Sequence, residues 1–130
     1  MKGFIADIEK ETLDNENFRK VLYTASYMQL VVMSIPAGED IGEEIHGQDQ
    51  FIRTEEGEGA AILDGVEHAL TADMATIIPA GTKHNVINRG ETSLKLYSIY
   101  AAPHHKDGTI HATKADAEKD HEEFLGDTTE

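Results

Sequence analysis

The spacing of turn residues between residues 19 and 100 is the feature that most constrains the fold. Short runs rich in β-branched and aromatic residues alternate there with Gly, Pro, Asp and Asn. A turn recurs roughly every ten residues, and the runs lack the period of an amphipathic helix. The pattern predicts about seven to nine short strands, and therefore an all-β sandwich or barrel.

The turns place the individual strands. The expected strands are KVLYTA, MQLVVMSI, AAIL, VEHAL, MATII, HNVIN and LKLYSIY. Asp64-Gly65 lies between two of them and is the strongest hairpin signal, because this dipeptide suits a two-residue turn. Gly57 and Gly59 indicate another hairpin turn rather than a phosphate cradle, because no lysine or helix start follows them.

The length of 130 residues suits one domain with a single core. We expect an N-terminal extension over residues 1–18, a barrel over 19–102 and a tail over 103–130. The extension is polar, and its segment IEKETLDNENFRK predicts a short helical turn. Residues 115–125 contain good helix formers, with Phe124 and Leu125 available to pack on the barrel.

Composition limits the chemistry that the chain can perform. It contains no cysteine, so a metal ion would need imidazole, carboxylate or amide ligands, and the seven histidines are the first candidates. The net charge of −14 repels phosphate backbones and anionic lipids, which argues against nucleic acid and membrane partners. No run reaches the length of a signal-peptide core or a membrane span, so we expect a soluble, cytoplasmic protein.

Four polar residues from two segments are candidates for one interior site. Glu44 and His46 are two residues apart and share a strand face. The turn residues at 47–49 predict that Gln50 begins an antiparallel neighbour strand opposite His46. If His84 lies on an adjacent strand, all four side chains converge inside the barrel.

The two segments resemble the two sequence motifs of the cupin family. In the first motif, Glu44 stands at the first histidine position and Gln50 at the glutamate position. The residues in register with the family pattern are Gly38, His46, Gly57, Pro79, Gly81, His84 and Asn88. Asp73 departs from it by replacing the opening glycine of the second motif, so that turn is expected to differ.

The resemblance covers roughly residues 20–102 and implies a cupin jelly-roll barrel, or double-stranded β-helix, around one divalent metal. The usual ligand set of three histidines and one glutamate contains one carboxylate. The set here, Glu44, His46, Gln50 and His84, contains one as well. Two imidazoles and one carboxylate suit Fe(II), Mn(II), Ni(II) or Zn(II) with open positions.

A barrel that has lost its metal is the alternative, with the four side chains hydrogen-bonded to one another. Burial would then raise the pKa of Glu44, and a nearby cation would remove that penalty.

Residues after the last expected strand form a second group of interest. His104, His105 and His111 could close over the barrel mouth as a polar cluster, or belong to a solvated tail. Tyr97 and Tyr100 have opposite parity, so at most one faces inward. Tyr100 could donate a hydrogen bond to a metal-bound ligand or simply pack between the sheets.

The leading functional prediction is a metal-dependent enzyme for a small polar metabolite. The resemblance implies sugar-phosphate isomerases of the mannose-6-phosphate type, dioxygenases or lyases, and it does not choose among them. A non-catalytic cupin that binds a small ligand or sugar is the alternative. No catalytic residue and no organic cofactor is assigned. The resemblance also implies a homodimer, in which a strand such as residues 3–8 extends the partner's sheet.

Overall fold

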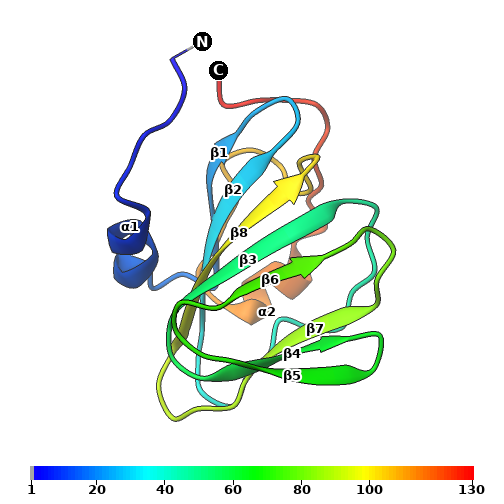
Figure 1. Ribbon diagram of the computed structural model, residues 1–130. Helices are drawn as coiled ribbons and strands as arrows, with labels where there is room; N and C mark the ends of the chain where they lie inside the picture. The colour runs from blue at the N-terminus through cyan, green and yellow to red at the C-terminus, as the bar shows by residue number, and fades with distance from the viewer. Residues whose placement is uncertain (1) are drawn as a thin grey trace.

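Two β-sheets face each other across a common core in the computed structural model, which describes residues 2–130 (Figure 1). The larger sheet has the strand order β6-β3-β8-β2-β1-β9, and the smaller has the order β5-β4-β7. The strands are β1 (Arg19–Thr24), β2 (Gln29–Ile35), β3 (Asp49–Glu56), β4 (Gly59–Leu63), β5 (Val66–Leu70), β6 (Ala75–Ile78), β7 (His84–Asn88), β8 (Leu94–Ala101) and β9 (Ile110–His111). The predicted all-β jelly-roll barrel is confirmed.

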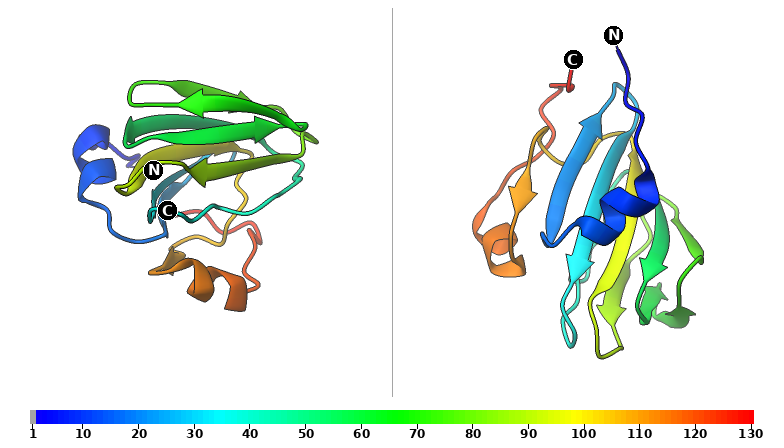
Figure 2. Two further views of the ribbon diagram at one scale, coloured as in Figure 1. Left: turned by 90° about the horizontal axis from the view of Figure 1, so that it is seen from below. Right: turned by 90° about the vertical axis from the view of Figure 1, so that its left-hand side faces the viewer.

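Two short helices flank the sheets, α1 (Ile8–Asp14) and α2 (Lys114–Lys119). Helix α1 lies across the outer face of the larger sheet, as Figure 2 shows. Lys95 of β8 holds it there, because its Nζ donates hydrogen bonds to the carbonyl oxygens of Leu13 and Asn15 at 2.9 and 2.8 Å. No helix in residues 2–130 is long and apolar enough to cross a membrane.

Alternating burial along the strands separates the core from the surface. In β3 the buried positions are Gln50, Ile52 and Thr54, while the residues between them are partly exposed. Strand β2 departs from this pattern, because the outward-facing Val32 is buried as well. Helix α1 and the residues after it cover that face, so apolar side chains are favourable on both sides of β2.

The C-terminal tail differs from the prediction of a helix over 115–125. Helix α2 ends at Lys119, and the chain then runs back along β1 until Thr129 N–H donates to the Thr24 carbonyl at 2.9 Å. Phe124 is only partly buried, and the Leu125 side chain, which we expected to pack on the barrel, is 73% exposed. Tertiary hydrogen bonds from His105 and His111 to the carboxylates of Glu122 and Asp120 outweigh the helix propensity of this segment.

The glycine turns were predicted with mixed success. Asp64 and Gly65 have φ values of 49° and 83° between the paired strands β4 and β5, which confirms the two-residue hairpin. The prediction of a hairpin at Gly57 and Gly59 is wrong, because β3 and β4 belong to different sheets. Gly57 forms a corner where a Cβ atom would lie 2.7 Å from the Ser93 carbonyl oxygen.

This contrast predicts different costs for two alanine substitutions. Gly65→Ala meets open space and only the strain of a positive φ, so it should lower the free energy of unfolding by about 1 kcal/mol. Gly57→Ala adds a backbone clash and should cost about 3 kcal/mol or more. Urea unfolding of both variants measures the difference, and equal losses would contradict the corner.

Candidate metal centre

Glu44 and His84 are brought together by an isolated β-bridge. Glu44 N–H donates to the His84 carbonyl at 2.8 Å, and His84 N–H donates to the Glu44 carbonyl at 2.9 Å. Residues paired in this way project from the same face of the sheet, and His46 is two residues further along that face. The rings of His46 and His84 are 4.8 Å apart between centroids, in an edge-on arrangement.

Gln50 reaches the same place by a route other than the predicted hairpin. The segment before 47 does not pair with β3, whose neighbours are β6 and β8, so that prediction is wrong. Gln50 is nevertheless buried and faces inward, and its Oε1 lies 3.1 Å from His46 Nε2. Its Nε2 donates to Ser98 Oγ at 2.8 Å, which turns the amide oxygen toward the histidine.

Backbone carbonyls set the tautomer of both histidines. His84 Nδ1 lies 2.9 Å from the Thr82 carbonyl oxygen, and His46 Nδ1 lies 3.1 Å from that of Gln48. A carbonyl oxygen can only accept, so each neutral ring carries its proton on Nδ1. Each Nε2 then presents a lone pair, which is the arrangement of metal-binding histidines.

The resulting donor set fits a divalent cation. One ligand atom each from Glu44, His46 and His84 can be chosen so that all three lie within 4.8 Å of one another. With its proton on Nδ1, His46 directs an Nε2 lone pair at Gln50 Oε1, which is also an acceptor, and a cation between them removes this repulsion. The Glu44 carboxylate has no hydrogen bond or ion pair within residues 2–130. One carboxylate and two imidazoles suit Fe, Mn, Ni or Zn.

Comparison with known proteins identifies the family. Residues 31–100, more than half of the chain, match the family described as Cupin domain, and this span includes all four candidate ligands. The chain belongs to the cupin family.

Similar proteins support this assignment, because their matches cover most of this chain. A crystal structure from Bacillus halodurans is 47% identical, with a TM-score of 0.90, and the match covers 92% of this chain and 96% of that one. An uncharacterised Bacillus subtilis protein is 48% identical over 89% of this chain, which spans 66% of the relative. An uncharacterised protein of Acanthamoeba polyphaga mimivirus is 42% identical, with coverages of 82% and 70%.

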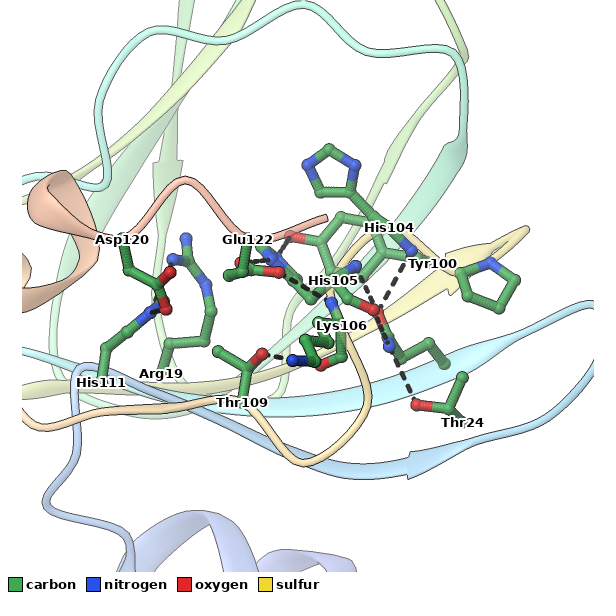
Figure 3. A network of polar contacts seen from close by, with 12 residues as sticks. Arg19, Thr24, Tyr100, His104, His105, Lys106, Thr109, His111, Asp120 and Glu122 are labelled. Atoms are coloured by element: carbon green, nitrogen blue, oxygen red, sulfur yellow. Dashed lines mark hydrogen bonds and ion pairs between the residues drawn. The ribbon is translucent and has the colours of Figure 1, made fainter. Parts of the chain in front are cut away.

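A second polar cluster of this cupin, drawn in Figure 3, reaches the candidate ligand His46 through Tyr100 and His104. Tyr100 faces inward and is 3% exposed, while Tyr97 lies on the opposite face against Phe51. The His104 ring lies 4.9 Å from the His46 ring and 5.2 Å from the Tyr100 ring, measured between centroids. His104 therefore joins the site.

The other two histidines of this group lie further from the candidate ligands. His105 Nε2 is 3.4 Å from the Tyr100 hydroxyl, and its Nδ1 is 2.7 Å from Glu122. His111 bonds instead to Arg19 and Asp120. Only part of the predicted histidine group thus reaches the barrel mouth.

Sequence reasoning missed Gln29, the residue that holds the histidine loop in place. Its Oε1 accepts from the backbone N–H groups of His104 and His105 at 3.2 and 2.9 Å, and its Nε2 donates to the His105 carbonyl. The side chain is fully buried. Its strand parity with Val31 and Met33 was a signal, because a glutamine at an inward position needs specific partners.

Burial and hydrogen bonds shift the protonation of this cluster. Burial lowers the pKa of His104 to about 4, with help from His105 and His46, and burial also lowers the pKa of His105. Burial alone would raise the pKa of Glu122, but hydrogen bonds from His105 and from the Lys106 backbone bring it down to about 2. Neutral histidines beside an ionised glutamate are therefore the state at neutral pH.

The depressed pKa of Glu122 predicts a pH-dependent contribution to stability. A carboxylate with a pKa of about 2 in the folded state and 4.5 when unperturbed stabilises the fold above about pH 4.5, and this stability is lost as the pH falls toward 2. Glu122→Gln should therefore lower the melting temperature at neutral pH and flatten its fall in acid. Thermal unfolding between about pH 7 and pH 3 measures both effects.

Glu123→Gln is the matched control, because Glu123 is exposed and has no hydrogen bond or ion pair within residues 2–130. It should retain the acid profile of the unmodified protein. Identical profiles for the two variants would contradict a stabilising role of Glu122.

Proposed function

We propose that this cupin binds one divalent transition metal through Glu44, His46, Gln50 and His84, and acts as an enzyme on a small polar metabolite. The convergence of unprotonated Nε2 atoms, an amide oxygen and an unpaired carboxylate carries the proposal. Without a cation, these acceptors would face one another with no donor between them.

The neighbouring side chains supply the polar groups that a reaction at such a centre needs. A bound metal would supply Lewis-acid or one-electron chemistry at positions that the protein leaves open. Tyr100 lies with its ring 5.7 Å from that of His46, and His105 keeps its hydroxyl on the interior side. With His105 neutral and its Nδ1–H directed at Glu122, the Tyr100 hydroxyl donates its one proton to His105 Nε2, so its oxygen can accept a hydrogen bond from a substrate hydroxyl. His104, which is only partly buried, lines the approach.

This arrangement supports isomerase, lyase or dioxygenase chemistry more than passive binding. A barrel that only captured a ligand would not need a tyrosine hydroxyl linked through His105 to Glu122 beside its metal ligands. The metal itself separates these reactions. Zinc cannot change its redox state, so native zinc would support isomerase or lyase chemistry, whereas iron would support dioxygenation.

Metal analysis of the natively purified protein tests the proposal. We expect about one equivalent of Fe, Mn, Ni or Zn per chain by elemental analysis. His84→Ala should lose most of this metal and remain folded, because the substitution removes a ligand and leaves the bridge of backbone hydrogen bonds in place.

His68→Ala is the control, because His68 lies exposed on β5. It should retain the full metal content. A metal-free native protein, or equal metal content in the two variants, would refute the proposed centre. Metal without turnover on any small polar substrate would favour the non-catalytic alternative.

We also propose that the protein is cytoplasmic and forms a homodimer, and the exposed N-terminal segment supports the dimer. Within the chain, residues 2–7 form no strand, Ile5 is 100% exposed, and its neighbour Phe4 lines an apolar groove with Tyr23 and Met28. Sedimentation at micromolar concentration should show a dimer, and Ile5→Glu should shift it toward monomer. Ile110→Glu, which changes an exposed isoleucine on β9, should not. A monomeric native protein would remove this proposal.

A further inference from the structure

Arg19 is a buried cation that the proposed function does not use. It shares the inward face of β1 with the core residue Val21, and only 7% of its surface is exposed. Figure 3 shows its guanidinium group rising from the strand toward the cluster of His105 and Glu122. Buried charges are normally neutralised by a partner, because removing them from water is costly.

One side of the guanidinium group has a partner. Arg19 Nη1 lies 3.3 Å from His111 Nδ1, and His111 Nε2 lies 3.0 Å from an oxygen of Asp120. Arginine can only donate, so His111 accepts a hydrogen bond at Nδ1 and donates one from its Nε2–H to the Asp120 carboxylate. His111 is therefore neutral in this chain of contacts and does not itself compensate the arginine charge.

The other side of the group lacks an acceptor. Arg19 Nε is buried and has no hydrogen-bond partner within residues 2–130, and no carboxylate in that range lies within 4.0 Å of the guanidinium nitrogens. The two more exposed arginines differ, because Arg53 pairs with Asp73 and Arg89 pairs with Glu67. The chain has 25 acidic residues, so a shortage of carboxylates does not explain why Arg19 lacks a carboxylate partner.

The nearby acidic side chains are already engaged elsewhere. Glu122 accepts from His105 and from the Lys106 backbone, and Asp120 accepts from His111. These contacts keep both carboxylates in place without a direct bond to the guanidinium. Figure 3 draws the Tyr100 hydroxyl and the histidine loop in the same cluster as Arg19, and Arg19 is among the charges that lower the pKa of His104, after burial and the neighbouring histidines.

We propose that Arg19 binds the carboxylate group of a small organic ligand inside the barrel. The Nε and Nη2 donors of an arginine form a planar fork that matches the two oxygens of a carboxylate. The inference that this ligand is the substrate rests on the proposed function, whereas carboxylate binding at Arg19 does not require a metal. The site thus selects for a small carboxylic acid among polar metabolites.

Calorimetric titration of metal-stripped protein tests the site. Malonate and acetate are the probes, inorganic phosphate is the competing anion, and sodium chloride holds the ionic strength constant. Malonate should bind the unmodified protein, and Arg19→Lys should weaken its affinity about tenfold or more, because lysine keeps the charge but loses the fork. Arg53→Lys is the control and should leave the affinity unchanged, because Arg53 lies on the outer surface in an ion pair.

Arginine side-chain NMR gives a second measurement that does not depend on the folding of an Arg19 variant. The chain contains three arginines, so Arg53→Lys and Arg89→Lys assign the three Nε–H signals by elimination. Added malonate should shift the signal of Arg19 and leave the other two in place. An unmoved Arg19 signal, or equal malonate affinity in Arg19→Lys, would overturn the proposal. Tighter binding of phosphate than of malonate would overturn the choice of a carboxylate.

The His84→Ala variant separates this inference from the proposed metal centre. Malonate binding that persists in that variant supports a site built on Arg19. Malonate binding that disappears with His84 would place the anion on the candidate metal ligands and would overturn the Arg19 site. A native protein without metal that still binds malonate would refute only the metal centre.

Discussion

Hydrogen bonds from two histidine Nδ1 atoms to backbone carbonyls determine what the barrel interior can do. The carbonyls of Gln48 and Thr82 belong to turns that lead into β3 and β7, so the strand positions also set the histidine tautomers. The lone pairs that result have no role in a hydrocarbon core. They stabilise the interior only when a cation or a hydrogen-bond donor lies between them. The backbone bridge with His84 holds Glu44 beside them, and the Glu44 carboxylate supplies the negative charge that a cation needs.

Closing the barrel depends on polar contacts as much as on apolar packing. Gln29 fixes the loop of His104 and His105 from inside, and Glu122 fixes His105 from the tail. Each contact satisfies a buried polar group that would otherwise destabilise the fold. The same contacts shorten α2, because a continued helix could not deliver both Asp120 and Glu122 to their histidines. The tail therefore gives up helical hydrogen bonds to complete the interior.

Strand parity was the part of the sequence that predicted most of the site. It placed Glu44 and His46 on one inward face and allowed at most one of Tyr97 and Tyr100 to face inward, and in the structure that residue is Tyr100. Parity could not tell which strands are neighbours, so the proximity of Gln50 to His46 was predicted through a hairpin that does not exist. Long-range partners were also out of reach, because Arg19 meets His111 from 92 residues away. Nothing local in the sequence marks such a pair.

The distribution of charge connects the two proposed sites. The net charge of −14 repels anions from the outside, and screening confines that repulsion to about 10 Å from the surface. Inside the barrel the sign reverses, since the proposed divalent ion would retain one positive charge beside Glu44 and the buried Arg19 adds another. Glu122 offsets one of them, and Asp120, whose side chain is 52% exposed, reaches Arg19 only through His111, so the buried groups keep a net positive charge until a carboxylate enters. An acidic exterior around a cationic interior then favours small acids that can shed their hydration and fit the barrel, while larger polyanions stay outside.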